Sequence, residues 1–154
     1  MMGLDIGSRR IGVAIGDELG ILASPIGFVE TGPQDRLAFA KIIQEHRITR
    51  LIVGIPRTMA GKEGPQSKIV RDYAKSLARD LEMPLTYWDE RLTTVIAERS
   101  LISGGRSRRQ RREEIDAAAA AVMLQGYLDH RAAIARTDSA ILGEIGDPQD
   151  RGME

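Results

Sequence analysis

The chain has 154 residues, and its 22 basic and 22 acidic side chains cancel, so the chain as a whole is not a polycation. This length fits one domain with a hydrophobic core of its own. The absence of cysteine excludes disulfides, thiolate zinc sites and thiol catalysis. The sequence contains no apolar run of membrane-spanning length and no signal peptide, and we therefore expect a soluble cytoplasmic protein.

The predicted elements begin with a hairpin. Apolar residues lead up to Asp5, and a second apolar run over 11–15 follows a turn at Gly7, which predicts two short antiparallel strands. A carboxylate on a buried strand is costly unless it is paired or bound to a metal, although Asp5 would also suit a turn cap. Glycines inside a strand, here Gly12 and Gly16, indicate close approach of another backbone or a ligand.

The rest of the chain alternates strand and helix patterns. In chain order we expect an edge strand over 21–30, a helix over 34–47, a buried strand over 50–56, a loop over 56–65, a helix over 66–81, a strand over 84–88 and helices over 92–103 and 113–131. This order predicts an α/β fold with a mixed five-stranded sheet, an antiparallel three-strand meander plus two parallel strands, flanked by helices. Residues 1–131 would form the domain, and 132–154 a flexible or loosely docked tail.

Three carboxylates stand out by their positions. Asp5 lies on the first strand, and Glu90 follows the end of a parallel strand, where open α/β sheets place their sites. Asp116 lies at the start of an alanine-rich helix, whose small side chains would let it approach the sheet. Oxygen ligands alone suit Mg²⁺ or Mn²⁺, and paired hard cations are what phosphodiester hydrolysis exploits. Helix capping and dipole interactions are the structural alternatives for Glu90 and Asp116.

A basic segment precedes the last helix. Two glycines at 104 and 105 are followed by five arginines, Arg106, Arg108, Arg109, Arg111 and Arg112. The segment has no apolar stripe to bury, so we expect a mobile basic flap that grips phosphates at the rim of the carboxylate site. The alternative is a solvated loop whose charge balances Glu113, Glu114 and the N-terminus of the next helix.

Four sequence blocks, in this order, resemble the YqgF family of RNase H-like nucleases: LDIGSRRIGVAIGD, IVGIPRTMAG, DERLTT and IDAAAAAVMLQGYLD. The resemblance extends over about residues 1–129 and implies an RNase H-like fold. It also implies a nuclease that matures the 5′ end of pre-16S rRNA and, in some members, resolves Holliday junctions. The catalytic and metal-binding positions of the family fall on Asp5, Glu90 and Asp116. Arg9, Arg91 and Thr93 are expected to contact the nucleic acid or to have a structural role.

The chain departs from the family pattern in places. Thr58 and Ala60 stand where members usually carry Asn and Asp, and Arg-Arg-Glu-Glu stands where a lysine commonly comes before the last aspartate. Glu113, three residues before Asp116, is either a fourth ligand or a surface acid at a helix N-terminus. Fewer residues precede the first strand than is usual in the family.

The resemblance implies a metal-dependent endonuclease with two Mg²⁺ or Mn²⁺ ions, in which water attacks phosphorus and leaves 5′-phosphate and 3′-hydroxyl ends. The expected partners are structured RNA, including ribosomal precursor particles, or branched DNA; we expect no membrane partner, and a homodimer stays open. Two alternatives remain. The first hairpin also resembles that of actin- and Hsp70-like ATPases, which need a second domain. A non-catalytic nucleic-acid-binding protein would show the same features.

Overall fold

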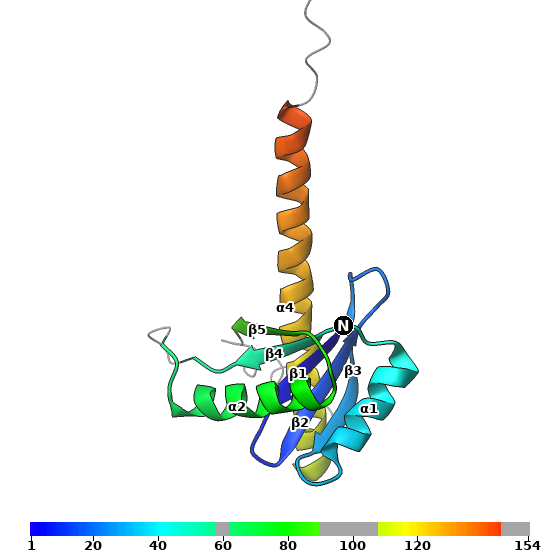
Figure 1. Cartoon of the computed structure of the whole chain (residues 1–154), viewed down its shortest axis with the longest axis vertical. Coiled ribbons are helices and arrows are strands. Elements are labelled where there is room, and N and C mark those ends of the chain that lie inside the picture. Colours follow the sequence, from blue (N-terminus) through cyan, green and yellow to red (C-terminus); the bar gives the residue numbers. More distant parts are fainter. Residues whose placement is uncertain (58–61, 90–107, 146–154) are drawn as a thin grey trace, which may run out of the picture.

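The computed structural model describes residues 1–57, 62–89 and 108–145 (Figure 1). Its centre is a five-stranded sheet with the order β3-β2-β1-β4-β5. The strands are β1 (Met2–Ile6), β2 (Arg10–Gly16), β3 (Ala23–Glu30), β4 (Leu51–Ile55) and β5 (Leu85–Asp89). Strands β1, β2 and β3 pair antiparallel, whereas β1, β4 and β5 run parallel. The predicted mixed sheet, with its antiparallel meander and two parallel strands, is confirmed.

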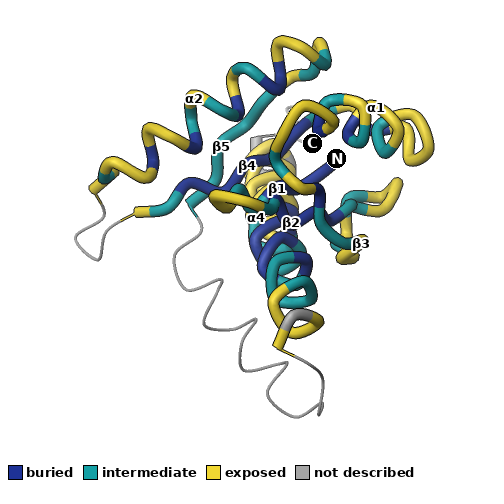
Figure 2. Tube along the Cα trace, turned by 90° about the horizontal axis from the view of Figure 1, so that it is seen from below, coloured by how far each residue is buried: buried dark blue, intermediate teal, exposed yellow. Residues whose placement is uncertain are grey.

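Helices cover both faces of this sheet. Helices α1 (Asp35–His46) and α2 (Pro65–Asp80) lie on one face, and α4 (Arg108–Ile145) crosses the other (Figure 2). Because successive side chains of a strand point to opposite faces, each face has its own apolar core. Leu4 and Val13 pack in the core beneath α1 and α2, whereas Ala14 and Ile52 pack against Leu124 of α4.

Helix α4 is longer at both ends than the sequence pattern predicted. It begins at Arg108, so the arginines from 108 to 112 lie on a helix, and the prediction of a flap is wrong for them. It continues to Ile145, past the expected end at Arg131, and extends beyond the sheet (Figure 1). Arginine, glutamate and alanine are strong helix formers, so these solvent-exposed turns need no apolar stripe. The domain boundary at 131 stays a prediction.

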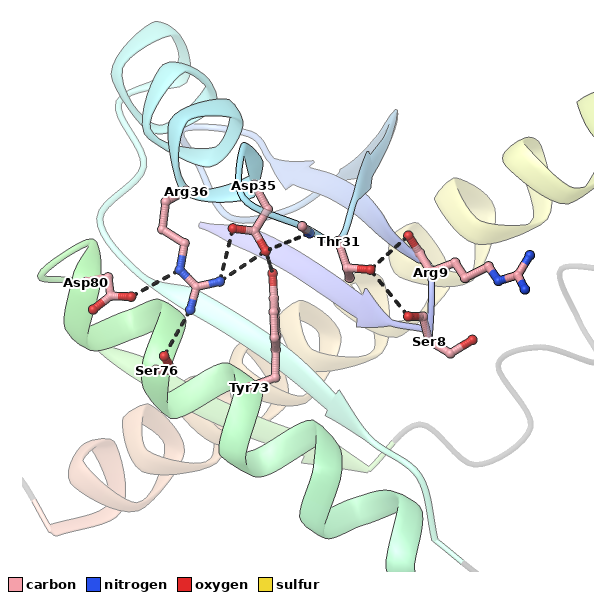
Figure 3. A network of polar contacts seen from close by, with 9 residues as sticks. Ser8, Arg9, Thr31, Asp35, Arg36, Tyr73, Ser76 and Asp80 are labelled. Atoms are coloured by element: carbon pink, nitrogen blue, oxygen red, sulfur yellow. Dashed lines mark hydrogen bonds and ion pairs between the residues drawn. The ribbon is translucent and has the colours of Figure 1, made fainter.

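A buried carboxylate ties α1 to α2. Asp35 accepts hydrogen bonds from Tyr73 Oη at 2.6 Å and from Arg36 Nη1 at 3.0 Å, and Arg36 also pairs with Asp80 at 3.1 Å (Figure 3). Burial by itself would raise the pKa of Asp35, but the hydrogen bonds from Tyr73, Arg36 and the Gly32 N–H lower that pKa overall. The network therefore keeps Asp35 ionised at the start of α1, next to the segment that follows β3.

Within the described ranges, no helix combines the length and the apolar character that crossing a lipid bilayer requires. The predicted helix over 92–103 lies outside the described residues, and so do residues 58–61 of the predicted loop over 56–65, which include Thr58 and Ala60.

Candidate active site

Asp5 lies on the face of the sheet that α4 covers. Gly3, two residues earlier in the same strand, faces α4, because a Cβ atom on Gly3 would lie 2.8 Å from the Leu124 Cβ. Alternate residues of a strand share a face, so the side chain of Asp5 points to the same side. Asp5 is half-buried, and its partner in the antiparallel ladder is Gly12 of β2.

At Gly12 the backbone of α4 lies directly against the sheet. A Cβ atom on Gly12 would lie 1.9 Å from the backbone oxygen of Asp116, so any side chain there would collide with the helix. The predicted close approach at the strand glycines is confirmed, and at Gly16 a Cβ would meet Leu128 at 3.5 Å. Because Gly12 pairs with Asp5 and contacts Asp116, the structure brings these two carboxylate-bearing residues to the same place on the sheet.

Arg10 is a site residue that sequence reasoning missed. Its Nε lies 3.1 Å from Oδ2 of Asp116, and its guanidinium lies over the Phe28 ring at 5.6 Å. Burial raises the pKa of Asp116, Arg10 opposes that rise, and Glu113 adds to it. The signal was present in the strand pattern, because Arg10 alternates with Gly12 and so shares the face that α4 covers.

Asp116 is one of the residues that line an open cleft of about 580 Å³. The cleft is lined by Gly7, Ser8, Arg9, Arg10, Glu30, Thr31, Arg112 and Asp116. Thr31 Oγ1 donates to the carbonyl oxygens of Ser8 at 3.3 Å and Arg9 at 3.1 Å, which fixes the β1–β2 turn at the edge of the cleft (Figure 3). The cleft therefore brings together arginines from the turn, from β2 and from α4 with the carboxylates of Glu30 and Asp116.

The other predicted site residues lie apart from this cleft or outside the described part of the chain. Arg108 and Arg111 are exposed on the first turns of α4, and Glu113 is half-buried near Asp116. Glu90, Arg91, Thr93 and Arg106, together with the side chain of Arg109, lie outside what the structure describes. The predicted roles of these residues stay predictions.

A second arginine missed by sequence reasoning lies at the carboxyl edge of the parallel strands. Arg57 follows β4, and its Nε lies 3.7 Å from Oδ2 of Asp89, the last residue of β5. Its Nη2 lies 3.7 Å from Oε1 of Glu63. Ile55 pairs with Asp89, so the predicted carboxylate Glu90 follows directly from this edge. The only sequence signal for Arg57 was its position one residue beyond the strand-ending Pro56.

The donor set at the site fits a hard divalent cation. No cluster of three or more His, Cys, Asp or Glu able to hold a metal occurs among the described residues, which exclude Glu90. Asp5 and Asp116 supply oxygen atoms alone, as Mg²⁺ and Mn²⁺ prefer. The raised pKa of Asp116 means that its negative charge is poorly solvated, and a bound cation would stabilise that charge.

The sheet order, the covering helices and the two carboxylates on one face define an α/β protein of the RNase H-like class. The sequence model of the RuvX family, described as "Holliday junction resolvase", matches residues 1–130, so the chain belongs to the RuvX family.

Relatives carry a more specific name. A "Putative pre-16S rRNA nuclease" of Paracoccus denitrificans is 44% identical over 138 residues, covering 88% of this chain and 87% of the relative. A protein of the same name from Carboxydothermus hydrogenoformans is 41% identical over 133 residues, covering 85% of this chain and 96% of the relative. The RuvC structure of Thermus thermophilus superposes with a TM-score of 0.48 at 15% identity, covering 86% of this chain and 95% of RuvC.

Proposed function

We propose that this protein is a metal-dependent endonuclease that hydrolyses phosphodiester bonds of structured RNA and processes the 5′ end of pre-16S rRNA in ribosome biogenesis. The single observation that carries the proposal is the meeting of Asp5 and Asp116 at Gly12, beside a cleft lined with arginines. Relatives named pre-16S rRNA nuclease support RNA as the substrate and ribosomal precursor particles as the setting.

In this function the carboxylates and the arginines have separate roles. Asp5 and Asp116, together with Glu90, would hold two Mg²⁺ or Mn²⁺ ions. Bound divalent cations supply Lewis-acid chemistry, which polarises the phosphoryl group and favours attack by water. Arg9 and Arg112 would bind phosphates in the cleft, and this positive charge offsets the repulsion between acidic side chains and a polyanion.

Branched DNA is the second candidate substrate, because the description of the matched family names a Holliday junction resolvase. RNA and DNA present the same phosphodiester to the same side chains, so the proposed site serves both. Membership of a nuclease family favours hydrolysis over the ATPase alternative.

Cleavage of matched substrates tests the proposal. The full chain is incubated with a labelled precursor 16S rRNA leader and with a four-way DNA junction, in Mg²⁺, in Mn²⁺ and in excess chelator. We expect metal-dependent cuts in the leader that leave 5′-phosphate ends, and weaker cutting of the junction. Faster cutting of the junction would support the DNA alternative, and absence of cleavage of both substrates would contradict the nuclease proposal.

Metal binding should be visible in the stability of the protein. At ten times the dissociation constant, a cation that binds only the folded chain should raise the melting temperature by about 4 °C. We expect Asp116→Asn to lose most of this gain, because the variant loses a charged ligand, while Asp72→Asn on the exposed side of α2 keeps it. Thermal melts over a Mn²⁺ series measure the difference, and equal gains in both variants would remove Asp116 from the metal site.

The arginines at the start of α4 should bind the phosphates of nucleic acid through their positive charge. Replacing Arg108, Arg111 and Arg112 by Gln should weaken binding to RNA and DNA alike. The slope of log affinity against log salt should flatten by about one unit for each lost phosphate contact. Arg136→Gln is the matched control, because Arg136 is exposed on the same helix, about 36 Å along the axis from Arg112. An unchanged slope in the triple variant would show that these side chains do not touch the substrate.

A further inference from the structure

We propose that Arg10 is a displaceable partner of Asp116: it neutralises this carboxylate before the divalent cation binds and moves to a phosphate of the nucleic acid afterwards. This inference rests on the proposed metal-dependent nuclease function. It assigns to Arg10 two successive partners in one reaction cycle, a carboxylate and then a phosphate.

Asp116 has the more closely held main chain of the pair. The backbone of α4 at Asp116 is in contact with Gly12, where even a single added carbon would lie 1.9 Å from the helix backbone. Arg10 is the mobile member, because only its long side chain has to move. Its backbone is held on both sides, since Arg10 pairs with Glu30 of β3 and its carbonyl oxygen accepts the Gly7 N–H at 2.9 Å.

The Arg10–Asp116 ion pair is exposed enough for a cation to replace Arg10 at the carboxylate. The side chains of Arg10 and Asp116 retain 24% and 30% of their exposure, so water and ions reach the contact from the cleft. Partly exposed ion pairs contribute little net stability, because their attraction is screened and the groups solvate well separately. The contact is therefore weak enough for Arg10 to be exchanged.

A guanidinium and a divalent cation cannot share this carboxylate without cost. The Arg10 Nε is 3.1 Å from Oδ2 of Asp116, so a cation bound to the same group would face a positive charge at short range. Repulsion between the two positive charges therefore favours withdrawal of Arg10 once the cation is bound. Removing the Arg10 charge should consequently make the cation bind more tightly.

The displaced guanidinium has a new partner in the same cleft. Arg10 lines the cleft together with Arg9 and Arg112, and the Phe28 ring 5.6 Å from its guanidinium carbon offers a surface for stacking. Guanidinium groups bind phosphate oxygens through paired hydrogen bonds, a geometry that lysine cannot reproduce. Loss of Arg10 should therefore weaken nucleic-acid binding while it strengthens cation binding.

Replacing Arg10 should thus strengthen cation binding and weaken nucleic-acid binding, and the experiment measures both affinities. The affinity of the full chain for Mn²⁺ is measured by isothermal titration calorimetry, and its affinity for a phosphorothioate-substituted RNA leader by fluorescence anisotropy in saturating Mn²⁺. We expect Arg10→Met to bind Mn²⁺ about fivefold more tightly and the leader about fivefold more weakly. Arg10→Lys, which keeps the charge, should leave Mn²⁺ affinity near that of the unmodified chain, and Arg136→Met should change neither affinity.

The outcomes distinguish failure of the proposed metal-dependent function from failure of the proposed exchange of Arg10. If the unmodified chain does not bind Mn²⁺, the proposed metal-dependent function fails. If it binds Mn²⁺ but Arg10→Met binds no more tightly, or if leader affinity is unchanged, the exchange alone is wrong. Circular dichroism confirms that each variant is folded, and Arg10→Gln takes the place of Arg10→Met in the same comparison if the methionine variant unfolds.

Discussion

Asp5→Asn is expected to reduce cleavage by at least about 10³-fold, the effect of losing about 4 kcal/mol of transition-state stabilisation. Asparagine keeps the shape of the side chain but removes the charge that would bind the cation. The fold should persist, because the main-chain pairing of residue 5 with Gly12 does not involve the carboxylate. Single-turnover cleavage at fixed Mg²⁺, with a thermal melt of the same sample, measures both effects.

The control for this variant is Asp72→Asn, which makes the same chemical change on the exposed surface of α2, on the opposite side of the sheet. We expect the control to cleave at the rate of the unmodified chain. Full activity in purified Asp5→Asn would rule out Asp5 as a ligand, and the proposed site would then need other carboxylates.

Gly12→Ala is expected to have the second large effect, because it adds a methyl group where none fits. The added carbon would lie 1.9 Å from the backbone oxygen of Asp116, and a helix backbone cannot yield as a flexible side chain does. We expect a loss of about 3 kcal/mol in the free energy of unfolding, the upper range for overpacking. Cleavage should fall as well, since α4 must shift and carry Asp116 with it.

Gly16→Ala provides the matched control. Gly16 lies on the same strand and faces the same helix, but its added carbon would meet Leu128 at 3.5 Å, an ordinary van der Waals distance. Denaturant unfolding and cleavage assays on both variants separate local crowding from the general effect of replacing glycine in a strand. Equal stability of the two alanine variants would contradict the close contact between β2 and α4.

The contact at Gly12 also explains how distant parts of the chain form one site. Asp5 reaches this point through strand pairing, and Asp116 reaches it through the packing of a helix with small, buried side chains, among them Ala119 and Ala120. Arg10, on the same strand as Gly12, then forms an ion pair with Asp116. Strand pairing, helix packing and an ion pair converge on one place, which the proposed function uses as its catalytic centre.

Much of the architecture could be predicted because it depends on local patterns. Alternating apolar residues and turn signals define the strands within a few residues, and a glycine inside a strand, such as Gly12, is typical of close approach by another backbone. The ends of α4 could not be predicted in the same way. Arg108, Arg111, Arg112 and residues 132–142 are exposed, so the pattern of buried apolar residues that reveals a packed helix was missing there.

The sequence by itself determined the hairpin, the sheet and the candidate carboxylates, since these follow from side-chain alternation and from the costs of burying charge. Only the tertiary structure decided the charge partners. Nothing near Arg10 in the sequence indicates Asp116, and nothing near Asp35 indicates Tyr73. Ion pairs and buried hydrogen bonds between distant elements depend on how those elements pack, and packing is a property of the whole chain.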